Sequence, residues 1–172
     1  MRKSTAFALA ITFVGLLGGD TTSAQKYEDK EHAELAKALK GVKVSLEKGL
    51  SASEPQGKPI SGKFEVEDGK LQLSVYTMKG DKFSEVIVDH RIGKIGKTEA
   101  ITGGEDLTAA KAQSGAMAKA KLSLRGATEK AVKANKGFQA VSATPSVKDG
   151  HPVVEVTLVK GEEFKTVSEK LD

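Results

Sequence analysis

Cysteine is absent from the 172-residue chain. Its absence excludes disulfides, a thiolate nucleophile, zinc held by cysteine and a lipid-modified N-terminal cysteine. The sequence also lacks a long apolar run. The longest, residues 6–17, is shorter than the ~20 residues that a membrane-spanning helix needs, and polar residues follow it. We therefore expect no membrane span and a fold held together by core packing alone.

The sequence also has no large excess of positive or negative charge. The net charge is only +4, and lysines alternate with glutamates, as in "YEDKEHAELAKALK", without forming a basic run. Nucleic-acid binding is therefore not expected. The three histidines, His32, His90 and His151, do not have the three- or four-residue spacing of helical metal ligands. We expect neither a metal site nor a cofactor.

The first 24 residues have the pattern of an export signal. Arg2 and Lys3 precede the apolar run, and the small residues of "TTSA" follow it. This order predicts a signal peptide at 1–24 with cleavage after Ala24, and hence a periplasmic or secreted protein. A transmembrane anchor is the competing interpretation of the same run.

The rest of the chain contains an internal repeat. A shift of 81 residues aligns the second halves of the two copies, and a shift of 78 aligns the first halves. The matched pairs are Ser45-Leu46 with Ser123-Leu124, Asp68-Gly69 with Asp149-Gly150, Lys79-Gly80 with Lys160-Gly161, Phe83 with Phe164, and Val86 with Val167. An ordered series across about 60 residues indicates a duplication.

Each copy has the same local signals. Ser45 and Ser123 are candidate N-caps, because a serine hydroxyl accepts from free amides of the first helical turn. "LQLSVYT" and "PVVEVTLV" alternate apolar and polar residues like strands with one buried face, and Asp-Gly pairs favour hairpin turns. The expected fold class is α+β: two repeated units, each with helices packed on a small antiparallel β-meander.

The boundaries follow from this repeat. We expect unit 1 at 25–96, a glycine-rich linker at 97–105 and unit 2 at 106–172. Phe83 and Phe164, being equivalent in the repeat, are expected in the core. Because each unit has only about 70 residues, its own core is thin, and the two units should pack together.

The order of helix, strand, Asp-Gly turn and "VEVTLVKG" resembles the PepSY domain. In the first copy, "VDHRIGK" is similar to the usual ending of that domain, with Asp89, Gly93 and Lys94 at the matching positions. Ile92 stands where threonine is usual. The resemblance implies a small, exported, non-catalytic module for which peptidase inhibition or ligand binding in the cell envelope has been proposed.

Two short motifs suggest chemistry but lack their companions. "GKT" at Gly96–Thr98 has Arg91 where a phosphate loop needs its first glycine. "SLEK" at Ser45–Lys48 has the spacing of a serine beside a lysine base, but the second copy has Gly126 in place of the lysine. We expect neither motif to be catalytic, and the chain not to be an enzyme.

Two hypotheses of function remain. In the first, the chain is an exported binding module that takes a peptide or protein of the cell envelope at a sheet edge or on the outer sheet face. In the second, it is a structural or assembly protein that uses the same edges to pair with itself, for example as a homodimer. Two separate meanders offer up to four such edges.

Overall fold

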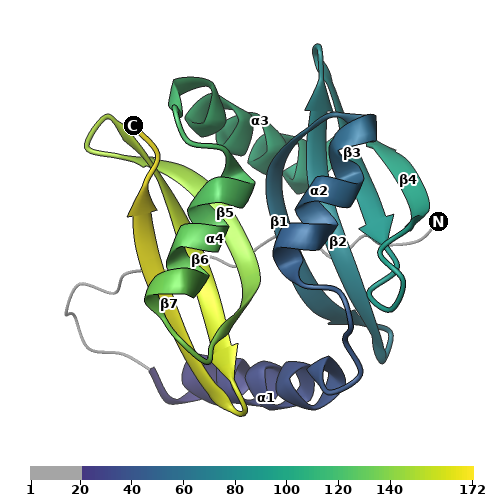
Figure 1. Ribbon diagram of the computed structural model, residues 1–172, viewed down its shortest axis with the longest axis vertical. Helices are drawn as coiled ribbons and strands as arrows, with labels where there is room; N and C mark the ends of the chain where they lie inside the picture. The colour runs from purple at the N-terminus through teal and green to yellow at the C-terminus, as the bar shows by residue number, and fades with distance from the viewer. Residues whose placement is uncertain (1–20) are drawn as a thin grey trace.

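The computed structural model describes residues 21–172 and shows an α+β fold in which four α-helices pack on one seven-stranded antiparallel sheet (Figure 1). Most of the expected signal segment lies outside the described residues, and the expected cut after Ala24 falls in the first turns of the first helix. In chain order the elements are α1 (Thr21–Leu39), α2 (Leu46–Ser53), the 3-10 turn η1 (Glu54–Gln56), β1 (Lys58–Glu67), β2 (Lys70–Lys79), β3 (Lys82–Val88), β4 (Ile95–Ile101), α3 (Gly104–Lys119), α4 (Leu124–Ala134), β5 (Gln139–Lys148), β6 (His151–Lys160) and β7 (Glu163–Lys170).

All seven strands belong to one sheet, in the order β4-β3-β2-β1-β5-β6-β7. Its centre is the seam between β1 and β5, which pair only through Gly62 with Ala143 and Lys63 with Ser142. The expectation of up to four open sheet edges is therefore wrong. Pairing of β1 with β5 uses two of them and leaves β4 and β7 as the edges.

Tight turns join the strands at the expected places. Asp68 and Asp149 both have a φ of 50°, and the glycine after each also has a positive φ. This is the backbone of a type I′ hairpin turn, in which both central residues need a positive φ. The β2–β3 and β6–β7 turns instead begin with Gly80 and Gly161, at φ values of 65° and 62°.

Helices cover both faces of the sheet, which differs from the single buried face that the alternation predicts. Figure 1 shows α2 and α4 in front of the strands, with α3 and α1 on the far side at opposite ends. Leu73 of β2 contacts α2 at Gly49, whereas Tyr76 donates a hydrogen bond to Asp106 of α3. All of residues 73–77 are consequently buried. We call the side of α2 and α4 the inner face and the side of α1 and α3 the outer face.

The expected linker at 97–105 is largely regular structure. Residues 97–101 are the second part of β4, which pairs with β3 along its length, and α3 begins at Gly104. Exposed strands carry little apolar alternation, which explains why the segment has the composition of a loop. Asp29 and Asp106, each of which precedes a helical pattern and would be expected to cap it, instead lie inside helices.

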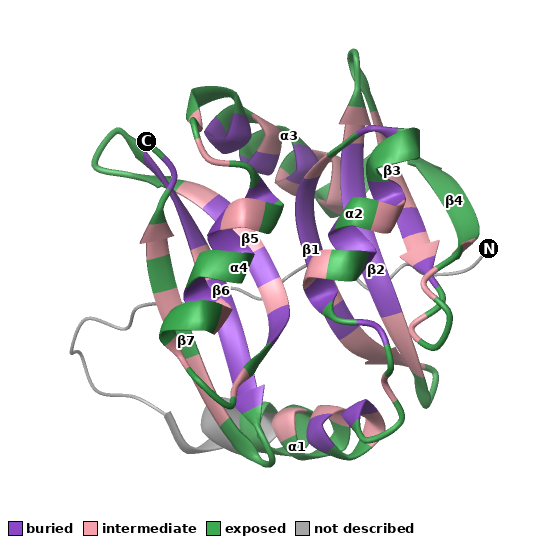
Figure 2. Ribbon diagram, viewed as in Figure 1, coloured by how far each residue is buried: buried purple, intermediate pink, exposed green. Residues whose placement is uncertain are grey.

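The main core lies on the inner face, between the two short helices and the central strands. Figure 2 shows buried segments concentrated in β1, β2, β5 and β6, with β4 exposed at the side. The fully buried side chains there include Leu46, Leu50, Leu73, Leu124 and Leu158. Because α2 also contacts α4, this core continues across the seam.

Candidate functional site

The predicted turn residues close the connection from β3 to β4. The carboxylate of Asp89 accepts hydrogen bonds from the amides of Arg91, at 2.8 Å, and Ile92, at 3.2 Å. These donors, the Arg91 amide first, lower the pKa of Asp89. The backbone closes the same loop, since Gly93 donates to the Asp89 carbonyl and Asp89 to the Lys94 carbonyl, each at 2.8 Å. Gly93 has a φ of 72°, so these residues shape a turn.

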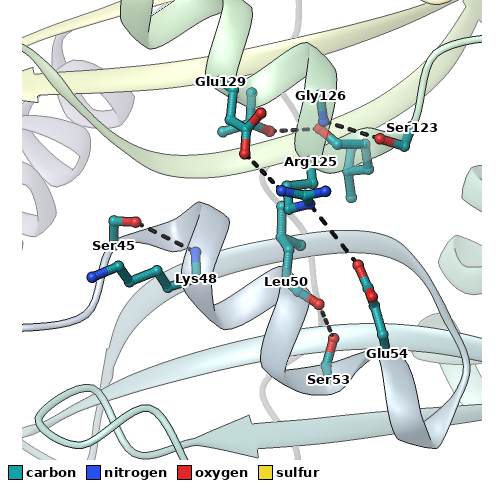
Figure 3. Close-up of polar contacts among 11 residues, drawn as sticks. Ser45, Lys48, Leu50, Ser53, Glu54, Ser123, Arg125, Gly126 and Glu129 are labelled. Carbon is teal, nitrogen blue, oxygen red and sulfur yellow. Dashed lines mark hydrogen bonds and ion pairs between the residues drawn. The ribbon is translucent and has the colours of Figure 1, made fainter.

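The two serines precede α2 and α4 in extended backbone conformations. The Ser45 hydroxyl accepts from the Lys48 amide at 3.4 Å, and the Ser123 hydroxyl accepts from the Gly126 amide at 3.1 Å (Figure 3). Both side chains therefore bond to backbone amides at a helix N-terminus. "GKT" at 96–98 lies within β4, so it cannot cradle a phosphate at a helix start.

Phe83 and Phe164 lie on the outer face and pack against the core, but each is only partly buried. The ring of His32, from α1, stacks on Phe164 with a centroid distance of 4.1 Å and an interplanar angle of 5°. Since α1 and α3 cross the outer face near opposite ends of the strands, they leave aromatic rings near the sheet edges partly open to solvent. Phe164 is therefore both a packing residue and a surface residue.

A hollow of about 440 Å³ lies beside this stack. It is lined by Asp29, His32 and Ala33 of α1, Glu162 of the β6–β7 turn, and Phe164. Two carboxylates thus flank a flat aromatic wall, a combination that suits a basic side chain with an apolar stem. Sequence reasoning missed this site because α1 and β7 are more than 120 residues apart and no local motif links them.

The hollow adjoins the open edge of the sheet at β7. The two-residue turn Gly161–Glu162 makes Lys160 and Glu163 a hydrogen-bonded pair, so odd-numbered residues of β7 point their backbone groups toward β6. The bond from the Leu171 amide to the Pro152 carbonyl, at 3.0 Å, agrees with this alternation. The backbone groups of Phe164, Thr166 and Ser168 therefore point outward, away from the sheet.

The outer face also carries charged residues near its centre. Lys63 and Glu65 form an ion pair at 2.5 Å, and the Tyr76 hydroxyl donates to Asp106 at 2.8 Å. Burial and the neighbouring carboxylates, against the opposing effect of the hydrogen bond from Ser74, raise the pKa of Glu85 above its ordinary value. Within residues 21–172, no group of three or more histidine and carboxylate side chains has the geometry to hold a metal ion.

Glu85 gives a pH-dependent prediction. Because its pKa is higher in the folded protein than in the unfolded chain, the carboxylate destabilises the fold above the folded-state pKa, and this penalty disappears as the pH falls to the ordinary glutamate value. We expect Glu85→Gln to raise the free energy of unfolding at pH 7 and to lose that advantage near pH 4. Urea unfolding at both pH values measures the difference. Glu34→Gln, at an exposed position of α1, is the control.

A smaller hollow, about 200 Å³, lies at the inner-face junction of the two halves. Arg125 of α4 lies beside it and extends between Glu129, at 2.9 Å, and Glu54 of η1, at 4.0 Å (Figure 3). All three side chains are about half exposed, so these ion pairs contribute little to stability. They connect α4 to the end of α2 across the surface.

Comparison with known proteins adds no relative: no protein-family model, curated protein or solved structure matches the chain. Among the helices of residues 21–172, none is both long and apolar enough to cross a bilayer.

Proposed function

We propose that the chain consists of two copies of a PepSY-like unit and is an exported, non-catalytic binding module of the periplasm or the extracellular space. The backbone supports the duplication. In each half, one carbonyl just after the third strand accepts two amides from the segment before the short helix. The bonds are Lys43 N and Val44 N to His90 O, at 3.0 and 3.1 Å, and Lys121 N and Leu122 N to Leu171 O, at 2.7 and 3.0 Å.

The offsets of these bonds support the duplication further. His90 and Leu171 differ by 81 residues, and Lys43 and Lys121 by 78, which are the two shifts of the sequence repeat. The β-bulges in β1 and β5, at 59–61 and 140–142, are also 81 residues apart. Bulges are specific irregularities, so equal placement in unrelated strands is improbable.

We infer that the ligand is an extended peptide that adds to the edge of β7. The observation that carries this proposal is the difference between the two edges of the sheet. In the first unit β4 pairs with the outer edge of β3, whereas no described strand pairs with β7, the strand equivalent to β3. A bound peptide would occupy beside β7 the position that β4 occupies beside β3.

The hollow supports specificity for a basic residue. In antiparallel pairing, the peptide residue opposite Phe164 directs its side chain to the same face as Phe164, which is the face on which the hollow lies. A lysine or arginine there can lay its stem along the His32–Phe164 stack and bring its charge to Asp29 and Glu162. Backbone hydrogen bonds along β7 would supply the affinity, and the contact with the hollow would select a peptide with a basic residue at this position.

Titration of the protein with a seven-residue peptide tests the proposal. Its one lysine is at position six, so that the peptide spans residues 163–169 of β7 when the lysine lies opposite Phe164. Ser168→Pro removes an outward amide of β7 without removing a bond to β6, so we expect a loss of affinity of about tenfold or more. Ser168→Ala, which keeps the amide, should bind as the parent does. Thr98→Pro, at the opposite edge, should also leave binding unchanged.

Charge reversal tests the hollow separately. Glu162→Lys should weaken binding of the lysine peptide and improve binding of a peptide with glutamate at the same place. If Ser168→Pro remains folded, by circular dichroism, and still binds with parental affinity, strand addition at β7 is wrong. If Ser168→Pro weakens binding but Glu162→Lys does not change the preference for lysine over glutamate, the peptide adds to β7 and the hollow does not determine specificity.

A further inference from the structure

The other edge strand, β4, has a self-complementary sequence. Its seven residues, "IGKTEAI", are symmetric in character about Thr98: Lys97 and Glu99 are opposite charges, the small residues Gly96 and Ala100 flank them, and isoleucines stand at both ends. Residues 96–100 are all exposed (Figure 2). Two such strands laid antiparallel about Thr98 would place each residue against its counterpart.

The backbone of β4 permits this pairing. The two-residue turn Gly80–Asp81 makes Lys79 and Lys82 a hydrogen-bonded pair, so odd-numbered residues of β3 point toward β4. The bond from the Asp89 amide to the Lys94 carbonyl agrees with this. Since Glu85 pairs with Glu99, the outward backbone groups of β4 belong to Thr98 and Ala100. Thr98 can therefore form a hydrogen-bonded pair with Thr98 of a second copy.

The charges select the same register. With Thr98 at the two-fold axis, Lys97 of each copy faces Glu99 of the other in a non-hydrogen-bonded pair, where side chains lie closest. Within one chain these two side chains already form an ion pair at 2.6 Å, and both are about half exposed. Pairing about Lys97 or about Glu99 would instead oppose like charges. Charged residues on an edge strand usually discourage pairing with other strands, but these two are compatible with β4–β4 pairing centred on Thr98.

At the edge of β7, two charged side chains are engaged by other parts of the chain. Lys165 lies 3.9 Å from the centre of the Phe138 ring, and Glu169 pairs with Lys130 of α4 at 2.7 Å. Lys97 and Glu99 instead pair with each other within β4, so both can take the opposite charge of a second copy. The two edges therefore differ in chemistry.

We propose that the protein forms a two-fold symmetric homodimer by antiparallel pairing of β4 with β4 of a second copy, which joins the two sheets into one. This inference is independent of peptide binding at β7, because it uses the opposite edge. The interface closes on itself and leaves both β7 edges at the far ends of the dimer, free for their ligands. A dimer would accordingly present two peptide sites.

Charge-reversal variants test the register. Sedimentation across a range of protein concentrations should show the parent change from monomer to dimer. Lys97→Glu and Glu99→Lys should each raise the dimer dissociation constant by about tenfold or more, because both cross-strand pairs become repulsive. An equimolar mixture of the two variants should dimerise again, since each then meets its opposite charge, and so should the variant that carries both changes.

A cross-link tests the axis directly. The chain has no cysteine, so Thr98→Cys introduces a single thiol at the two-fold axis. Hydrogen-bonded partners have Cα atoms about 5.5 Å apart, within the range of a disulfide. Oxidation should give a covalent dimer from Thr98→Cys, and much less from Ser168→Cys on β7. A monomeric parent at all concentrations, a dimer unaffected by Lys97→Glu, or equal cross-linking at both edges would overturn the proposal.

Discussion

Gly57→Ala is expected to lower the free energy of unfolding by roughly 2–4 kcal/mol, among the largest effects of a single methyl group in this protein. Gly57 joins η1 to β1 with φ 156° and ψ 175°, a conformation almost confined to glycine. An added Cβ would lie 2.7 Å from the carbonyl oxygen of Met78. Because that atom belongs to the backbone of β2, no side-chain rotation can relieve the contact.

Gly115→Ala is the matched control for this substitution. Gly115 lies on the exposed side of α3, where an added Cβ meets nothing within 4 Å. Alanine should raise the stability there by roughly 0.5–1 kcal/mol, because it favours the helix. Thermal or urea unfolding of the two variants should give shifts of opposite sign. If Gly57→Ala is as stable as the parent, Gly57 does not have this glycine-specific conformation in solution.

Leu50→Ala should cost roughly 2–5 kcal/mol, because it removes a fully buried side chain from the core above the seam. Gly62 lies beneath it in β1, and a Cβ there would come within 2.9 Å of Leu50 Cδ2 and 3.3 Å of Leu46 Cδ1. Gly62→Ala alone should therefore destabilise by about 1–3 kcal/mol through overpacking.

The two changes should not be additive. Once Leu50 is shortened, the methyl group of Gly62→Ala enters the space that it leaves, so the double variant should lose at least about 0.5 kcal/mol less than the sum of the single losses. A double-mutant cycle by urea unfolding measures this coupling. Strict additivity would mean that Leu50 does not cover the β1–β5 pair at Gly62.

The local structure was largely predictable from short-range patterns. Period-two alternation located β2 and β6, and the Asp-Gly pairs located the turns in which Asp68 and Asp149 adopt a positive φ. The prediction of helix starts after Ser45 and Ser123 relied on the hydroxyl that each serine offers to its own helix. These features depend on atoms a few residues apart, so the sequence contains their cause.

β4 and the hollow were not predictable in the same way. Residues 96–100 are exposed, so the segment carries no apolar alternation, and only its pairing with β3 makes it a strand. Phe164 and His32 meet because α1 crosses the outer face. Composition cannot reveal a contact that depends on where a distant helix lies.

By itself the sequence determined the α+β class, the position of most strands and turns, and the absence of cysteine chemistry. Tertiary structure alone decided that β1 pairs with β5, that helices cover both faces, and that, among the strands of residues 21–172, only β4 and β7 stay open. The physical reason is the separation along the chain of the groups that interact. Turns and caps are satisfied by neighbouring residues, whereas a strand edge is open or closed according to which distant backbone comes to lie beside it.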